Sequence, residues 1–186
     1  MSQSVASVSK SPTHSFSKVP VPFIKVIAGL GVEGDCHAGR TVQHPPQCQI
    51  TPPPVNLRQV HLLPMECLRE VSAKLNKPLS AGDIGENVTT EGIDLLSLPR
   101  GTELRFSSPG VQHEAIIVLT GVRNPGPGFD KFRPGIKEKF VRRDSNHRII
   151  KRLAGVMGVV KQGGMIKPGM KITSVQPGKS EALAVV

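Results

Sequence analysis

The chain has 186 residues, with 24 Lys and Arg against 14 Asp and Glu, and its formal net charge is +10 at pH 7. This length suits one domain that buries its own apolar core without support from disulfides or metals. With no Trp, no Tyr and six Phe, the chain can hardly build the aromatic platforms on which single-stranded nucleic acids stack. The charge indicates either a solvated basic surface or attraction to an anion such as a phosphorylated cofactor, nucleic acid or a membrane surface.

The three cysteines, Cys36, Cys48 and Cys67, form an odd count without a Cys-x-x-Cys pair. This usage argues against a secreted disulfide framework and for a reducing, cytoplasmic compartment. No apolar run is long enough to span a bilayer, and the N-terminus lacks the apolar region of a signal peptide. The first 32 residues are Ser-rich and free of acids, so mitochondrial targeting is the alternative, although they also lack arginine.

In chain order, the first half indicates short strands, glycine turns and one helix. Residues 4–9 form either a Ser-rich tail or a first strand. Residues 20–27 are predicted to form one strand, whose prolines suit an edge strand or a strand start. Residues 29–39 form a glycine-rich turn whose glycine spacing matches neither a Walker loop nor a dinucleotide fingerprint. Residues 44–56 are predicted to be an irregular, mobile surface loop, followed by a buried strand at 59–63 and a helix at 64–75.

From residue 79 onwards, the spacing of turn residues is typical of a β-barrel or sandwich. Strands are predicted at 102–106 and 111–120, and a Pro- and Gly-rich connection at 120–131 has the composition of a ligand-binding loop. A basic helix is predicted at 131–143. Residues 155–161 and 169–175 are predicted to form a hairpin that closes the sheet, and residues 176–186 a frayed tail.

Several residues could carry chemistry. One hypothesis is a zinc site, because thiolates and imidazoles are good zinc ligands. Its candidate ligands are Cys36, His37, His44, Cys48 and His61, but their spacing fits no zinc finger or zinc ribbon. Cys36 beside His37 is a candidate nucleophile and base, although sequence neighbours usually point in different directions. Glu33 with Asp35, and Asp83 with Glu86, are candidate acid and base pairs, whereas acids in Gly-rich turns more often accept backbone N–H bonds. Cys67, at helical spacing among apolar residues, is interpreted as a small core hydrophobe.

Five blocks of the sequence, in order, resemble the MOSC domain, the module related to the C-terminal part of molybdenum cofactor sulfurases. The blocks extend over most of residues 5–172; they are 29–39, 60–63, 82–96, 120–125 and 154–158. The resemblance implies a mainly β, barrel-like domain of Greek-key type over residues 4–175, with a few peripheral helices and a tail at 176–186. It also assigns residues 4–9 to the first strand.

The family is associated with binding of the pyranopterin molybdenum cofactor, with pyridoxal phosphate binding at family level, and with sulfur transfer or reduction of N-hydroxylated substrates. The resemblance therefore implies a small-molecule cofactor and substrate, and an electron- or sulfur-donor protein as a further partner. Its characteristic cysteine follows Asn-Pro in the fourth block, where this chain has Gly126. Because glycine cannot carry sulfur or ligate molybdenum, activity is expected to be lost, altered or supplied by another thiol, with Cys36 the first candidate.

The cofactor-binding residues that the resemblance implies are Asp35, His37, Glu86, Asn87, Thr120, Arg123, Asn124 and Asp130. Arg123 can bind a phosphate through two N–H groups, or it can tie its loop to Asp130 or Glu33. Asn87 and Asn124 can read the edge of a pterin, and His37 can instead be a satisfied structural imidazole.

Two other functions are open. The chain can be a non-catalytic binding protein of the same fold for an anionic heterocycle. It can also be a basic nucleic-acid-binding domain, because residues 131–151 contain four arginines and four lysines, although no nucleic-acid-binding motif is present and this function is the least favoured.

Overall fold

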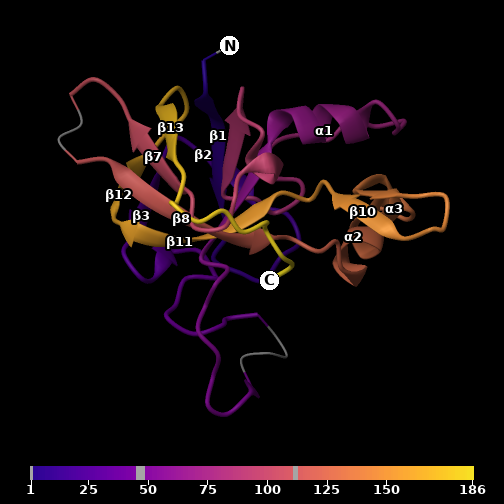
Figure 1. Cartoon of the computed structure of the whole chain (residues 1–186), viewed down its shortest axis with the longest axis horizontal. Coiled ribbons are helices and arrows are strands. Elements are labelled where there is room, and N and C mark those ends of the chain that lie inside the picture. The colour runs from indigo at the N-terminus through magenta and orange to yellow at the C-terminus, as the bar shows by residue number, and fades with distance from the viewer. Residues whose placement is uncertain (1, 45–48, 111–112) are drawn as a thin grey trace.

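A computed structural model describes residues 2–44, 49–110 and 113–186, and its centre is a closed β-barrel of seven strands (Figure 1). Around the barrel, each strand pairs with the next and the last pairs with the first; the strands are β1 (Ser4–Lys10), β6 (Val88–Glu91), β5 (Val60–Pro64), β11 (Val156–Gln162), β8 (Ala115–Val122), β7 (Glu103–Ser107) and β13 (Lys171–Val175). Every pair is antiparallel except β5 with β6. The expectation of a mainly β, barrel-like fold with few helices is confirmed.

Strand β5 shows how the barrel acquires two cores. Its side chains alternate between faces, as a strand requires, so Val60 and Leu62 enter the barrel interior with the other buried Val, Ile and Leu. Leu63 points to the opposite face and joins a second apolar cluster under the helices, with Leu68, Phe129 and Phe140. A fully buried strand in a small barrel therefore needs an outer layer, which the helices provide.

The outer layer consists of three short helices and one 3₁₀ turn on one side of the barrel (Figure 1). They are α1 (Met65–Ser72), α2 (Pro127–Phe132), α3 (Ile136–Lys139) and η2 (Leu95–Ser97). Helix α1 begins at Met65, one residue after the predicted start, and ends at Ser72, three residues before the predicted end; the Ser72 side chain accepts a hydrogen bond from the Leu79 N–H. None of the helices in the described ranges is long and apolar enough to cross a membrane.

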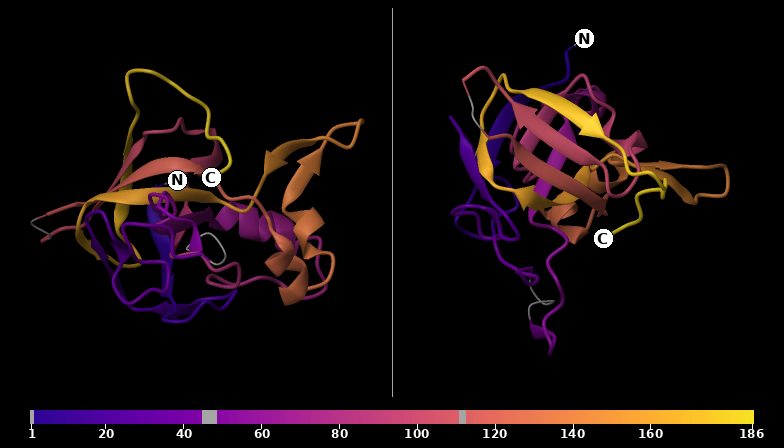
Figure 2. Two further views of the ribbon diagram at one scale, coloured as in Figure 1. Left: turned by 90° about the horizontal axis from the view of Figure 1, so that it is seen from below. Right: turned by 60° about the vertical axis from the view of Figure 1, so that its left-hand side comes forward.

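Smaller sheets surround the barrel. Strand β2 (Val19–Val21) pairs with β1, and β3 (Ile24–Ile27) lies between β4 (Gly31–Val32) and β12 (Gly164–Ile166). Strands β9 (Val141–Arg143) and β10 (Ile149–Arg152) form a hairpin that projects from the helical side (Figure 2).

The structure confirms the strands expected near 4–9, 59–63 and 102–106, and it corrects four other expectations. The stretch at 20–27 forms two strands, β2 and β3, not one. The prediction of a basic helix at 131–143 is wrong: Gly135 has a φ of 77°, so the chain forms two short helices and strand β9.

Residues 155–161 and 169–175 form no hairpin, because β11 pairs with β5 and β8 while β13 pairs with β7 and β1. The long loop at 120–131 is reduced to residues 123–126, since β8 continues to Val122 and α2 begins at Pro127. The predicted strand start at residues 111–112 lies outside the described residues.

The segment after β13 is not frayed. The Val122 N–H donates to the Ala184 carbonyl at 2.8 Å, the Arg100 N–H donates to the Glu181 carbonyl at 2.8 Å, and Val185 bridges to Val122. These bonds fold the segment back along β8, towards the centre of the molecule (Figure 1). The domain boundary at residue 175 stays a prediction.

Candidate functional site

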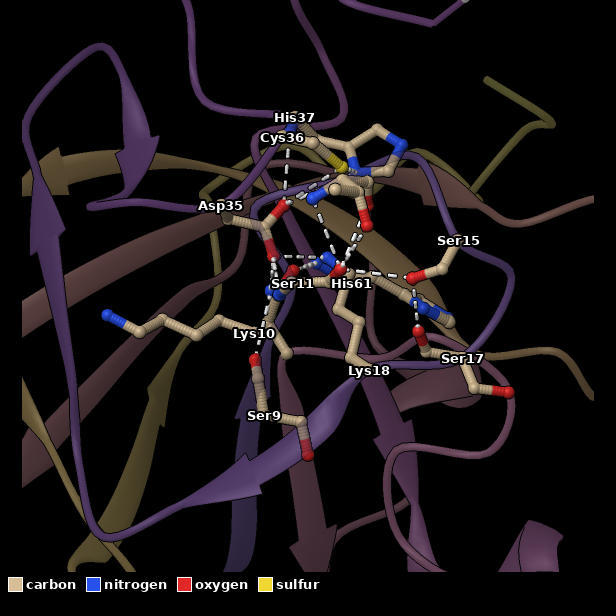
Figure 3. Close-up of polar contacts among 12 residues, drawn as sticks. Ser9, Lys10, Ser11, Ser15, Ser17, Lys18, Asp35, Cys36, His37 and His61 are labelled. Atoms are coloured by element: carbon tan, nitrogen blue, oxygen red, sulfur yellow. Dashed lines mark hydrogen bonds and ion pairs between the residues drawn. The ribbon is translucent and has the colours of Figure 1, made fainter.

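The Asp35 carboxylate joins its own turn to two other segments of the chain, residues 11–18 and the segment around Asn87 (Figure 3). It accepts hydrogen bonds from the backbone N–H groups of Ser11 (3.2 Å) and His37 (3.0 Å) and from Asn87 Nδ2 (3.0 Å), and Lys18 Nζ lies 2.7 Å away. The Lys18 and Asp35 side chains are only 3% and 1% exposed, so water contributes little to their stabilisation. Asp35 therefore positions the residues around it and has little capacity left for a ligand.

The charge state of this buried pair follows from its contacts. Burial alone would raise the Asp35 pKa, but the hydrogen bond from His37 and the charge of Lys18 outweigh it and hold that pKa well below its usual value. Burial also lowers the Lys18 pKa, while Asp35 opposes that change. At neutral pH the carboxylate is ionised and holds the lysine in place.

The backbone of the loop at residues 82–86 requires glycine at two positions, Gly82 and Gly85. Gly82 and Gly85 have φ of 88° and 80°, a conformation that costs other residues about 1–2 kcal/mol. A Cβ on Gly82 would lie 2.3 Å from the Lys18 carbonyl oxygen, and one on Gly85 would lie 2.3 Å from the Phe16 carbonyl oxygen. The glycines therefore let the segment 11–18 lie directly on this loop.

His61 and Arg123 occupy the floor of the site. His61 is buried, and its Nε2 lies 2.7 Å from the Ala154 carbonyl, so Nε2 carries the proton and donates it. Burial and the nearby charge of Arg123 lower the His61 pKa well below its usual value, so the ring is neutral. Its Nδ1 is then free to accept from Arg123 Nη1 at 3.4 Å.

Arg123 is held from several sides. Its Nη1 donates to the Ile84 carbonyl, and its guanidinium carbon lies 4.9 Å from the centre of the Phe129 ring and 5.8 Å from that of Phe16. Burial lowers its pKa to about 10, partly offset by Glu86, so the group stays charged. The alternative that Arg123 ties its loop to Asp130 or Glu33 is wrong, since Asp130 accepts from the Lys137 N–H and Glu33 pairs with Lys25.

These residues line a hollow of about 90 Å³. The wall is made by Lys18, His37, Val42, Gln43, His44, Asn56, Arg58, His61, Gly85, Asn87, Arg123 and Met157. Within the described part of the chain, three cations and no carboxylate line it. Arg58 donates through Nε and Nη2 to the backbone oxygen of Val186, which leaves Nη1 for another acceptor. The hollow is therefore an electropositive site suited to a small anionic group.

The site residues implied by the resemblance divide into three groups. His37, Asn87 and Arg123 line the hollow. Asp35 and Glu86 are buried and do not line it. Thr120, Asn124 and Asp130 also do not line it: Thr120 donates to the Leu57 carbonyl at 2.6 Å, and Asn124 accepts from Arg152 Nε at 2.9 Å. These three are positioning or surface residues in this structure.

Asn87 and Glu86, the candidates from the block at residues 82–96, form hydrogen bonds within the protein. Asn87 donates to Asp35 and to the Ser9 carbonyl, and its Oδ1 accepts from the His61 N–H at 3.1 Å, so it has little capacity to read a pterin. Glu86 Oε1 accepts from the Gly82 N–H (2.6 Å) and Thr89 (3.0 Å), while Oε2 has no partner among the described residues. Burial raises the Glu86 pKa. Through Oε1, Glu86 stabilises the glycine loop.

Cys36 and His37 meet despite being neighbours, because residues 34–38 form a turn in which Asp35 holds the His37 backbone. Cys36 Sγ lies 3.1 Å from His37 Nδ1, and burial, together with the charge of Asp35, raises the pKa of the Cys36 thiol.

The sequence did not indicate His14 as a site residue, but its ring centroid lies 5.2 Å from that of His37. The His44 ring stacks on His37 at 6.2 Å, whereas His61 is bonded elsewhere and Cys48 lies outside the described residues. Cys67 is buried, as expected, and its pKa is raised to about 11 by burial.

Gly126 stands at the start of α2 with extended backbone (φ −94°, ψ −176°), and a Cβ there would have no neighbour within 4 Å. The geometry would thus accept a cysteine, but the chain has no thiol at this position.

Three charged or polar residues of the hollow were not predicted from the sequence; they are Lys18, Gln43 and Arg58. Of these, Lys18 could have been noticed as a lysine directly before a strand, but its partner Asp35 is 17 residues away in the sequence.

Comparisons with known proteins address the fold and family. The MOSC domain model matches residues 34–173. Among solved structures, the YuaD protein from Bacillus subtilis is similar with a TM-score of 0.71 at 22% identity, covering 92% of this chain and 94% of that one. YiiM from Geobacillus stearothermophilus is similar with a TM-score of 0.63 at 18% identity, covering 96% and 77% of the two chains.

YiiM from Escherichia coli has a TM-score of 0.62 at 15% identity, covering 97% of this chain and 73% of that one. At these identities the structural likeness concerns the fold. A search of curated proteins gave no significant match.

Proposed function

Since this chain belongs to the MOSC domain family, we propose that it binds the pyranopterin molybdenum cofactor, with an anionic group of that cofactor in the hollow beside Arg123. The observation that supports this most is the convergence of Lys18, Arg58 and Arg123 on one hollow that no carboxylate of the described residues lines. Charge-assisted hydrogen bonds from guanidinium groups are a strong way to hold a phosphate. The same charges would repel a cationic ligand.

The size of the hollow limits which part of the cofactor it fits. A volume of about 90 Å³ is below the roughly 300–1,000 Å³ of sites that enclose a whole small molecule. The donor set therefore fits the phosphate end, and the heterocycle would lie outside the hollow. Arg58 and Arg123 would hold the anion, and Gln43, whose Nε2 donates to the Thr41 carbonyl, keeps its Oε1 as an acceptor.

The residues fit the metal end less well. When bound, the cofactor supplies a molybdenum centre able to carry sulfur or exchange electrons, and the family's cysteine for that centre is Gly126 here. Among the described residues, Cys36 is the thiol next to the hollow, through its contact with His37. We include in the proposal that Cys36 replaces the missing thiol if the protein turns over, in which case a protein that donates electrons or sulfur is also required.

Gly126 supports a second candidate, a non-catalytic protein that holds an anionic heterocycle. In that case the pocket would bind the organic part of the cofactor and retain little molybdenum, because a glycine offers no soft ligand.

Reconstitution of the purified chain with molybdenum cofactor separates these functions. Molybdenum and pterin should be measured per protein, together with reduction of an N-hydroxylated substrate in the wild type and in Cys36→Ser. Equal molybdenum and pterin support the first function, and loss of turnover in Cys36→Ser assigns the thiol. Pterin without molybdenum supports the second function, and binding of neither contradicts both.

A further inference from the structure

The imidazoles of His14 and His37 and the thiol of Cys36 lie together at the rim of the site. Each offers one ligand atom, and these three atoms all lie within 4.8 Å of one another. They come from two separate segments, the one that follows β1 and the turn that follows β4, and Figure 3 shows Cys36 and His37 side by side above Asp35. Two segments that pack through Asp35 and Lys18 thus bring together three residues that are good metal ligands.

The distances suit a tetrahedral cation. Metal bonds of about 2.0–2.3 Å to nitrogen and sulfur place neighbouring ligand atoms about 3.3–3.8 Å apart. Cys36 Sγ and His37 Nδ1 are 3.1 Å apart, close to that range. The His14 ligand atom lies within 4.8 Å of the other two, so a shift of its side chain by about an ångström brings it into the range. His14 is exposed, so its ring can rotate without displacing a buried side chain.

The chemistry of the set selects the kind of metal. One thiolate and two neutral imidazoles suit borderline and soft cations such as Zn²⁺, and they are poor ligands for Mg²⁺ or Ca²⁺. Asp35 Oδ1 lies 3.3 Å from His37 Nδ1 and 4.0 Å from Cys36 Sγ, which adds negative charge beside the three ligands. This charge favours a cation at the rim even though the hollow itself is lined by cations.

We propose that His14, Cys36 and His37 form a zinc-type metal site with three protein ligands and one open position. Catalytic zinc sites have this ligand count, whereas structural zinc sites usually have four protein ligands. The site needs neither molybdenum nor the proposed cofactor, but a metal held by Cys36 would occupy the thiol that the proposed turnover requires. Because His37 also lines the hollow, a metal here would lie next to the bound anion.

Cobalt(II) titration tests the proposal on the full chain. The experiment uses a Cys48→Ser, Cys67→Ser background, in which Cys36 is the sole thiol. One equivalent of cobalt should give thiolate-to-metal charge-transfer absorption and the visible bands of four-coordinate cobalt, and zinc should displace it. Cys36→Ser should abolish the charge-transfer band, and His14→Ala should weaken binding by about tenfold or more.

His147→Ala is the matched control, because His147 is exposed and lies in the distant β9–β10 hairpin. This variant should bind cobalt like the background, and circular dichroism confirms that each variant is folded. Absence of the charge-transfer band overturns the proposal. Equal cobalt affinity in His14→Ala and His147→Ala also overturns it, since His14 then is not a ligand.

Discussion

Removal of Lys18 tests whether the buried ion pair organises the site. Lys18→Met keeps most of the side-chain volume and removes the ammonium, which leaves the Asp35 carboxylate buried without its counter-charge. Breaking a buried pair costs about 3–5 kcal/mol. Asp35 keeps the three N–H donors of Ser11, His37 and Asn87, so we expect a loss near the lower end, about 3 kcal/mol. This is a large part of the roughly 5–15 kcal/mol that stabilises a typical domain.

Asp35→Asn should cost more, about 5 kcal/mol, because its amide NH₂ would meet N–H donors and Lys18 would lose its anion. The double variant Lys18→Met, Asp35→Asn should be more stable than the sum of the single losses predicts, by about 2 kcal/mol. Urea unfolding of the four proteins gives this coupling energy directly. Losses that add within about 0.5 kcal/mol would refute the reasoning, because two groups in direct contact in a buried site must couple.

Three further predictions concern Gly85, His61 and Gly126. Gly85→Ala should lose at least about 2 kcal/mol in urea unfolding, from a positive φ and a Cβ placed 2.3 Å from the Phe16 carbonyl, while Gly178→Ala, in open space, should lose little; equal losses would contradict this packing. Unfolding stability should fall by up to about 1.4 kcal/mol per pH unit as the pH drops below about 6.5, because unfolded His61 binds a proton that the folded, neutral ring excludes. His61→Gln, which can still donate to the Ala154 carbonyl, should flatten this slope over pH 5–6.5, and an unchanged slope would exclude His61 as its source. Gly126→Cys should unfold within about 0.5 kcal/mol of wild type, since its Cβ meets nothing, and should retain more molybdenum on reconstitution than Gly126→Ala; equal retention would show that this position does not face the metal.

The sequence predicts a barrel strand well where one face is apolar, as in β7, since a period of two is a local property. It fails where pairing depends on distant partners. Nothing local says that β11 pairs with β8 and β5. The packing of residues 181–186 on β8 is likewise a tertiary contact of a segment that has no strong pattern of its own. The break at Gly135, by contrast, had a local signal in the Pro134-Gly135 pair, which the prediction of one basic helix placed in its first turn.

The candidate site shows the same limit. Asp35, His37 and Arg123 could be selected from blocks that resemble the MOSC domain, but their roles depend on contacts with other segments. Lys18 becomes a site residue only because Asp35 lies 2.7 Å from it, and His14 only because the segment 11–18 folds over Gly82 and Gly85. Thr120, Asn124 and Asp130 belong to a matching block or lie near it, yet their hydrogen bonds turn them away from the hollow.

The most direct test of the account compares cofactor affinity in two variants that each remove one positive charge. Arg58→Gln removes a cation from the wall of the hollow, and Arg148→Gln removes one from the exposed β9–β10 hairpin. If the hollow holds the anionic group, Arg58→Gln should weaken binding of the pyranopterin cofactor by about tenfold or more, a lost charge-assisted hydrogen bond being worth about 1.5–3 kcal/mol, and Arg148→Gln should leave it near wild type. Equal affinities in the two variants would contradict the account.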